Sequence, residues 1–223
     1  MAELIKANEP FTFVTRLHLL ELTGQRASNL SQLLDCIKKM PNSSIYYHTH
    51  AFLQEYQYLA QDSPNDFAYW VSEVLGEIEL GEQLSGIDTM QFAKIQDLQL
   101  AIAQTIENYL KSNELAKLRF ARTNEEFHFI RSINFIIPTK FIAYDLKEFV
   151  DILKKVSKDS IYFHVFEARL RLEKPINDFS AWIRQSLNDK ELADKISHLD
   201  PYTRTLEELR KAIIRMIERR ILQ

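Results

Sequence analysis

The chain has 223 residues, of which 46% are hydrophobic and 26% are charged, a globular composition that excludes disordered and fibrous proteins. With only 4 Gly and 6 Pro it is poor in turns, which favours helices over a β-sandwich or barrel, and its net charge of −3 attracts neither nucleic acid nor an anionic membrane. The single cysteine, Cys36, excludes an intramolecular disulfide framework and a multi-cysteine zinc site.

The predicted elements begin with a strand and continue with helices. Residues 11–19 alternate between apolar and polar side chains, as a strand does. Leucine and isoleucine then recur at i, i+3, i+4 and i+7 over residues 30–37, which predicts a helix that stops at Pro41. Further helices are expected to start after Asn42-Ser43, at Pro64-Asn65-Asp66, near Leu80 and at Asp88.

The second half of the chain repeats the first. A shift of 116 residues aligns Phe11-Thr12-Phe13 with Phe127-His128-Phe129, and the segment 44–48 with 160–164. Shifts of 112 and 111 residues align the later segments, and the first of these places Trp70 on Trp182. Because this period is far longer than that of a solenoid repeat, we expect two copies of one small domain.

The two copies are predicted to span residues 1–111 and 127–223, joined by a charged linker over residues 112–126. Residues 1–112 carry 7 Lys and Arg against 14 Asp and Glu, a balance of −7, whereas residues 113–223 carry 21 against 17, a balance of +4. Opposite charges favour docking of the copies. The expected fold is therefore mainly α, with two copies of a roughly five-helix unit packed as one pseudo-two-fold body and a short β pairing between the repeat starts.

Some residues that the copies share have a structural explanation. Asn65 and Asn177 are good N-cap residues, and Asp66 and Asp178 follow them in the first turn, where a carboxylate complements the helix dipole. The aromatic residues after them lie at helical spacing, which indicates core packing.

His48 and His164 need a different explanation, because each lies one turn into its expected helix. The first interpretation is a buried, neutral imidazole that is hydrogen-bonded to a backbone carbonyl or a carboxylate, with Asp66 or Asp178 as the candidate partner. The second is a pair of ligand-facing histidines that the pseudo-two-fold brings together.

The second helix of the first copy is more polar than its counterpart. It reads Tyr46-Tyr47-His48-Thr49-His50 where the other copy reads Tyr162-Phe163-His164-Val165-Phe166, and residues 54–58 extend it with polar and aromatic groups. We therefore expect a ligand site on this helix. The candidate binding residues, counterparts included, are Tyr46, Tyr47, His48, His50, Asp66, His164 and Asp178.

We expect no metal and no cofactor. His48 and His50 are two residues apart, about 200° around a helix, so they cannot bind one ion together. The sequence lacks a Gly-rich phosphate loop and a nucleophile elbow. The C-terminal helix is basic, which indicates a solvated face, with an RNA or partner-protein surface as the alternative. Its basic residues are Arg204, Arg210, Lys211, Arg215, Arg219 and Arg220.

Several motifs together resemble an uncharacterised bacterial protein family of about this length. They are Phe11-x-Phe13 followed by Thr15-Arg16, Glu21-x-Thr23-Gly24, SIYYHTH at residues 44–50, PNDFAYWV at residues 64–71, and Leu80-Gly81-Glu82. The resemblance covers nearly the whole chain and implies a bacterial origin. It implies no activity, ligand or catalytic residue.

These observations favour a non-enzymatic binding or adaptor protein that recognises a small molecule or a partner protein. The first alternative is an enzyme that uses His48 or His50 with Asp66 as general acid and base on a polar substrate. The second is an RNA-contacting protein that acts through the basic C-terminal helix. Since no apolar run reaches the length of a membrane span and the N-terminus lacks a signal-peptide pattern, we expect a cytoplasmic protein without membrane contact, compatible with a homo-oligomer.

Overall fold

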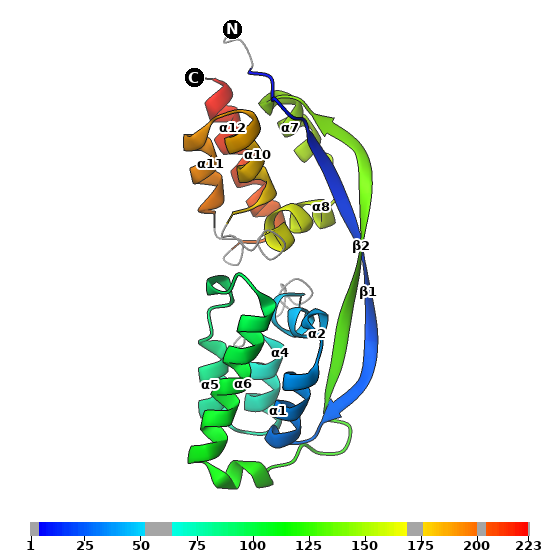
Figure 1. Cartoon of the computed structure of the whole chain (residues 1–223), viewed down its shortest axis with the longest axis vertical. Coiled ribbons are helices and arrows are strands. Elements are labelled where there is room, and N and C mark those ends of the chain that lie inside the picture. The colour runs from blue at the N-terminus through cyan, green and yellow to red at the C-terminus, as the bar shows by residue number, and fades with distance from the viewer. Residues whose placement is uncertain (1–4, 52–63, 169–175, 200–203, 223) are drawn as a thin grey trace. The chain divides into compact units, whose positions relative to one another are not determined.

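Two long strands and a series of short helices make up the protein (Figure 1). The computed structural model describes residues 5–51, 64–168, 176–199 and 204–222. Strands β1 (Phe11–Ala27) and β2 (Phe127–Ala143) each have 17 residues and pair as a two-stranded antiparallel sheet. The segment 54–58, expected to extend the second helix, lies outside the described residues.

The prediction of a mainly α fold with a short β pairing is wrong, because the strands are long elements of the fold. The alternation at residues 11–19 indicated a strand, but the pattern ends there and both faces of β1 become exposed beyond it. A pattern with no buried face gives no signal of a strand, so the sequence showed where β1 begins and not how far it extends.

The chain also divides into two compact units, where one body was expected. One unit combines residues 1–17 with 134–223, and the other comprises residues 18–133. We call them the discontinuous unit and the continuous unit. The start of β1 therefore belongs with the helices of the second repeat, and the start of β2 with the helices of the first.

The register of the sheet follows the internal repeat. In the continuous unit the Thr23 hydroxyl donates a hydrogen bond to the Phe129 carbonyl at 2.7 Å, and in the discontinuous unit the Thr139 hydroxyl donates to the Phe13 carbonyl at 2.5 Å. In both contacts the two residue numbers add up to 152. A shift of 116 residues turns one contact into the other, so the two units repeat the same strand geometry.

The helices of the continuous unit pack around the aromatic start of β2. Phe127 and Phe129 are buried in one hydrophobic core with Leu30, Phe67 and Trp70. The helical segments are α1 (Leu30–Lys39), α2 (Asn42–Tyr46), the π-helix η1 (Tyr47–Ala51), α4 (Asp66–Tyr69), the π-helix η2 (Trp70–Val74), α5 (Ile78–Ser85), η3 (Thr89–Gln91), α6 (Ile95–Ser112) and η4 (Glu114–Leu118).

The discontinuous unit repeats this arrangement around the start of β1. Phe11 and Phe13 contact the rings of Phe149, Phe179 and, from Phe11, Trp182, with centroid distances of 4.8–6.1 Å between the rings of this cluster. The helical segments are α7 (Leu146–Leu153), α8 (Lys158–Tyr162), the π-helix η5 (Phe163–Glu167), α10 (Asp178–Ser186), α11 (Lys190–Ser197) and α12 (Leu206–Ile221).

Helix boundaries agree with the local sequence signals. The Asn29 side chain caps α1 by accepting from the Gln32 N–H, and α1 ends before Pro41 as predicted. At equivalent places after η2 and α10, Gly76 (φ 69°) and Asn188 (φ 56°) adopt the left-handed conformation that glycine and asparagine tolerate best.

Candidate functional site

The seven predicted site residues lie in two equivalent groups, one in each unit. Tyr46, Tyr47, His48 and His50 are at least nine-tenths buried on α2 and η1, and so is His164 on η5. Asp66 and Asp178 are partly buried at the starts of α4 and α10. The structure brings each buried histidine together with the aspartate of its own unit.

His48 uses both nitrogens of its imidazole ring. Its Nδ1 lies 2.7 Å from Oδ2 of Asp66, and its Nε2 accepts the backbone N–H of Ile130 in β2 at 3.0 Å. Because Nε2 accepts a hydrogen bond from the backbone, the ring is the neutral tautomer that carries its proton on Nδ1, which donates a hydrogen bond to Asp66. The predicted pairing of a buried neutral histidine with this carboxylate is confirmed.

A serine one turn earlier completes the contact with the strand. The Ser44 hydroxyl donates a hydrogen bond to the Ile130 carbonyl at 2.8 Å, and His48 accepts a hydrogen bond from the N–H of the same residue. One residue at the strand edge thus has both of its backbone groups satisfied by side chains from α2 and η1. We call Ser44, His48 and Asp66 the strand clamp, because they do for Ile130 what a further strand would do.

The discontinuous unit holds an equivalent but less complete arrangement. His164 Nδ1 lies 2.8 Å from Oδ2 of Asp178, and its Nε2 accepts the backbone N–H of Val14 at 3.0 Å. Ser160 is the counterpart of Ser44, but its buried hydroxyl has no hydrogen-bond partner among the described residues. The histidine and aspartate therefore carry the shared function of both clamps, which is to fix the strand on the helices.

Both histidines are enclosed by aromatic rings. The His48 ring lies 4.8 Å from that of Phe127 and 5.5 Å from that of Phe67, and the His164 ring lies 4.9 Å from Phe11 and 5.4 Å from Phe179. These rings exclude water from the imidazoles, which strengthens their hydrogen bonds. The same packing leaves the histidines at most 3% exposed, so a ligand in solution does not reach them.

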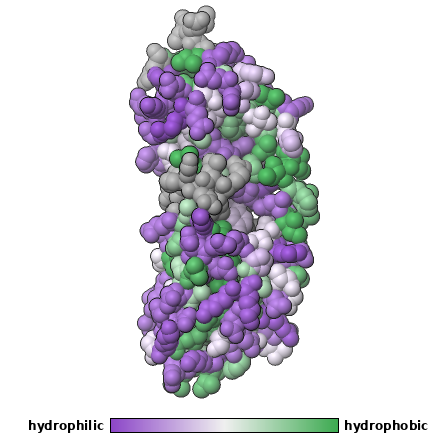
Figure 2. Space-filling view, viewed as in Figure 1, coloured by the Kyte–Doolittle hydropathy of each residue, from purple (hydrophilic) through white to green (hydrophobic). Residues whose placement is uncertain are grey.

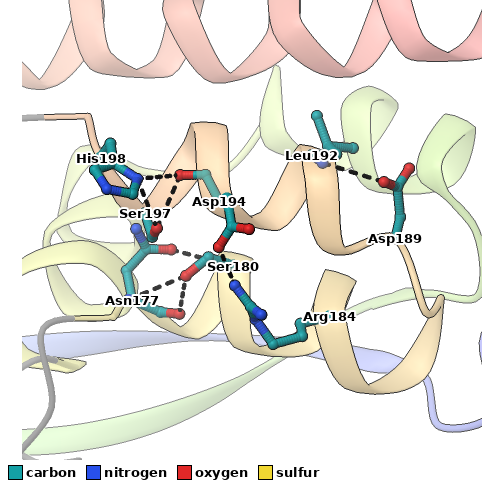
Figure 3. A network of polar contacts seen from close by, with 8 residues as sticks. All are labelled: Asn177, Ser180, Arg184, Asp189, Leu192, Asp194, Ser197 and His198. Atoms are coloured by element: carbon teal, nitrogen blue, oxygen red, sulfur yellow. Dashed lines mark hydrogen bonds and ion pairs between the residues drawn. The ribbon is translucent and has the colours of Figure 1, made fainter.

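The shared asparagines act as helix caps, as predicted. The Asn65 side chain accepts the Ala68 N–H at 2.9 Å and donates to the Leu84 carbonyl. Asn177 accepts the Ser180 N–H at 2.9 Å and donates to the Ile196 carbonyl in the same way. Figure 3 shows this cap together with the ion pair between Arg184 of α10 and Asp194 of α11, which joins the two helices.

His50 differs from the clamp histidines. Its Nδ1 lies 2.8 Å from the Thr49 hydroxyl, and its ring stacks on Tyr46 at a centroid distance of 5.4 Å. In the other unit the Phe166 ring stacks on Tyr162 at 4.8 Å in the same place. Burial lowers the pKa of His50 to about 4, so this side chain is neutral at physiological pH.

Across the described residues, the chain shows surface grooves but no metal-binding cluster. Among the described residues, no group of three or more His, Cys, Asp or Glu side chains could hold a metal ion. Two surface grooves of about 330 and 380 Å³ lie elsewhere, along α11 and α12 and along α7 and α12. In the described ranges, no helix is long and apolar enough to cross a membrane.

One residue of the basic helix is structural. Arg210 was predicted to lie on a solvated face, yet it is buried and donates two hydrogen bonds of 2.9 Å to the carbonyls of Leu153 and Val156. It thereby caps the end of α7. The position of Arg210 directly after buried Leu209 in α12 was the available signal, because an arginine beside an apolar stripe often buries the aliphatic part of its side chain.

Sequence reasoning also missed two polar clusters. In the discontinuous unit Arg16 forms a buried ion pair with Glu167 at 2.6 Å. In the continuous unit the buried Glu77 accepts from the Tyr109 hydroxyl at 2.6 Å and pairs with Arg119 at 2.9 Å. Neither cluster has a motif, since the partners are at least 32 residues apart in the sequence.

Comparisons with known proteins identify a family whose function is not established. A model of the family of unknown function DUF5752 matches residues 8–218. The solved structure described as "The structure of OrfY from Thermoproteus tenax" is similar to this chain, with 29% sequence identity, a TM-score of 0.81 and coverage of 96% of each chain. No curated protein matches.

Proposed function

Because the chain belongs to the DUF5752 family, which brings no established activity, we propose from its geometry that it is a non-enzymatic adaptor that binds a partner protein. A single observation carries the proposal: the middle of the β ribbon exposes large apolar side chains. In the continuous unit these are Leu19 (47% exposed), Leu20 (46%) and Leu22 (70%).

The exposed residues form a group, not scattered single positions. Leu20 and Leu22 lie on one face of β1 and Leu19 on the other, because successive side chains of a strand point to opposite faces. Figure 2 shows hydrophobic residues gathered along the side where Figure 1 draws the strands. In the discontinuous unit Leu17, Phe135, Ile136 and Ile137 are likewise exposed. Exposed large apolar side chains concentrated in one segment are typical of a protein interaction site.

The charge of the continuous unit indicates the chemistry of its partner. Residues 18–133 carry 9 Lys and Arg against 15 Asp and Glu, which gives 9 − 15 = −6. We therefore infer a partner with an apolar centre and a basic rim, because complementary charge increases the association rate and disfavours wrong partners.

The geometry supports an adaptor better than the enzyme alternative. General acid–base catalysis needs a side chain that can exchange a proton with a substrate. Both ring nitrogens of His48 are engaged, with Asp66 and with the backbone of Ile130, and the ring is enclosed in the core. Bacterial origin and a cytoplasmic location stay predictions.

A matched pair of surface variants tests the proposal. Leu20→Lys/Leu22→Lys places two charges on the ribbon, and Leu100→Lys/Leu115→Lys places the same charges on leucines of α6 and η4 that are 67% and 79% exposed. We expect chemical cross-linking in host cells to capture a partner with the wild type and with the α6–η4 variant, and to lose it with the ribbon variant. The proposal is wrong if the ribbon variant keeps the wild-type partner.

A further inference from the structure

β1 and β2 begin with the same pattern of two phenylalanines, although the two strand starts lie in different units. Phe11 and Phe13 lie in the discontinuous unit, and their repeat counterparts Phe127 and Phe129 lie in the continuous unit. The rings of each pair contact the clamp histidine of their unit, His164 or His48. The apolar contacts therefore do not decide which strand start occupies which unit.

This ambiguity allows a competing assembly. If the β1 strands of two copies paired with each other in the same antiparallel register, Phe11 and Phe13 of each copy would occupy the place of Phe127 and Phe129 on the first-repeat helices of the other. Such a strand-exchanged dimer would place phenylalanines at the two positions where Phe127 and Phe129 contact the rings of His48 and Phe67. A protein that avoids it needs a residue that distinguishes β1 from β2.

Arg16 makes this distinction. Its side chain is completely buried, its Nη1 lies 2.6 Å from Oε1 of Glu167, and its guanidinium carbon lies 4.0 Å from the centre of the Tyr162 ring. Asn134 donates to the same Glu167 oxygen at 2.9 Å. All four residues belong to the discontinuous unit, so the start of β1 carries a positive charge that this unit neutralises.

The two sequence positions of the continuous unit that correspond to Arg16 and Glu167 carry neither an arginine nor a glutamate. The repeat shift of 116 residues puts Ser132 where Arg16 stands and Ala51 where Glu167 stands. Ser132 is small and buried. An arginine in its place would be overpacked, and the sequence position that corresponds to Glu167 is an alanine, which has no carboxylate to pair with it. A buried charge without its partner is strongly unfavourable.

We infer that the Arg16–Glu167 ion pair makes β1 pair with β2 of its own chain and excludes a strand-exchanged dimer formed through β1. The reverse pairing is penalised as well, because two β2 strands would place Ser132 against Glu167 and leave that carboxylate, whose side chain is only 14% exposed, without its arginine. Buried ion pairs add little stability over apolar residues, but a buried polar group can specify pairing and register.

A single cysteine reports the exchanged dimer. In the native sheet, paired residues of β1 and β2 have numbers that add up to 152. If a second β1 strand took the place of β2, each partner's number would be lower by the repeat shift of 116, so the sum would be 36. Residue 18 of one copy would then face residue 18 of the other. We would introduce His18→Cys into a Cys36→Ala chain and measure covalent dimer after mild oxidation. Arg16→Ser/Glu167→Ala, which gives the discontinuous unit the residues of the continuous one, is expected to raise the dimer yield roughly tenfold or more.

Controls separate pairing specificity from general damage. Lys154→Ser/Glu218→Ala removes an ion pair of 2.8 Å that is about half exposed in the same unit, and should leave the dimer yield at the parent value. Reversal of the buried pair, Arg16→Glu/Glu167→Arg, should also leave the dimer yield at the parent value. The charge at position 16 then still needs its oppositely charged partner at position 167. The inference is overturned if folded Arg16→Ser/Glu167→Ala gives no more dimer than the parent, or if the exposed-pair control gives as much.

A second variant decides the question if circular dichroism shows that Arg16→Ser/Glu167→Ala does not fold. Ala51→Glu, made with the native Arg16 and Glu167, supplies the first-repeat helices with the carboxylate that they lack. It should permit the exchanged dimer and again raise the yield of His18→Cys cross-links roughly tenfold. A yield equal to that of the parent would overturn the inference.

Discussion

Gln99 and Arg210 occupy equivalent positions of the internal repeat and bond equivalent pairs of backbone carbonyls. Gln99 Nε2 donates to the carbonyls of Ile37 at 2.6 Å and Met40 at 3.0 Å, and Arg210 donates to those of Leu153 and Val156. Gln99 reaches from α6 to the C-terminal end of α1, and Arg210 reaches from α12 to the C-terminal end of α7. Both repeats make these hydrogen bonds to the carbonyls, although one uses a glutamine and the other an arginine. We therefore interpret the contact as a structural requirement of the fold.

Removal of either cap should destabilise its unit. Arg210→Ala leaves two buried carbonyls without donors and should lower the free energy of unfolding by about 2–3 kcal/mol, and Gln99→Ala by about 1–2 kcal/mol. Arg210→Gln should recover part of the loss, because glutamine already performs this task at position 99. Urea unfolding measures these changes, with exposed Arg219→Ala as a control expected to stay within about 0.5 kcal/mol of the wild type. A loss in that control as large as in Arg210→Ala would contradict the assignment.

The strand clamp should behave as a stability element. His48→Ala removes the acceptor of the Ile130 N–H and the donor to Asp66, so we expect a loss of roughly 1–3 kcal/mol. A double-mutant cycle with Asp66→Ala should give a coupling energy of about 0.5–3 kcal/mol, since the two side chains are in direct contact. The cycle of His164 with Asp178 serves as its internal replicate. Additive losses in both cycles would show that the histidine–aspartate contacts contribute nothing.

Much of the local structure could be predicted from the sequence. The repeat, the N-caps at Asn65 and Asn177, and the pairing of His48 with Asp66 follow from patterns that act over one or two helical turns or that recur in both copies. A residue type kept at two equivalent positions of one chain indicates that both copies need the same contact there.

The sequence did not predict that the start of β1 packs with the helices of the second repeat and the start of β2 with those of the first. Phe11-x-Phe13 and Phe127-x-Phe129 are interchangeable as hydrophobic surface, and the hydrophobic effect is not directional. The residue that distinguishes them, Arg16, pairs with Glu167 across 151 positions of the chain. A contact of that separation has no signature in one sequence, so the repeat alignment assigned each strand to its own copy.

The hydrogen bond between Tyr109 and Glu77 predicts both a stability loss and a shifted titration. Burial, followed by the hydrogen bond to the Glu77 carboxylate, raises the pKa of Tyr109 to about 12. The stabilisation is complete below the unfolded value of about 10 and should disappear as the pH rises from about 10 to about 12. Tyr109→Phe should lower the free energy of unfolding at pH 7 by about 2 kcal/mol, because it removes a bond to a charged group.

Ultraviolet titration of the phenols checks this assignment directly. The wild type should retain one protonated tyrosine at about pH 11 that Tyr109→Phe lacks. The control is Tyr144→Phe, at a side chain that is 48% exposed, and it should leave the unfolding free energy unchanged. The assignment fails if the late-titrating phenol persists in Tyr109→Phe.

His50 should make the protein sensitive to acid. Its pKa is about 4 in the folded protein, below the value of 6.5 for an exposed histidine, so the unfolded chain binds a proton first as the pH falls. The free energy of unfolding should therefore decrease between about pH 6.5 and pH 4, by up to about 3 kcal/mol from this group. Above pH 6.5 both states are neutral at this position and the contribution is constant.

The second repeat supplies the variant that tests this effect. Phe166 stacks on Tyr162 as His50 stacks on Tyr46, so His50→Phe should keep the ring packing and remove the titrating group. The Thr49 hydroxyl keeps its own acceptor in the variant, because it donates to the Ile45 carbonyl at 2.7 Å. Urea unfolding at pH 7, 5.5 and 4 should show a smaller acid-induced loss in His50→Phe than in the wild type. Equal losses in the two proteins would mean that the buried His50 ring does not govern the response to acid.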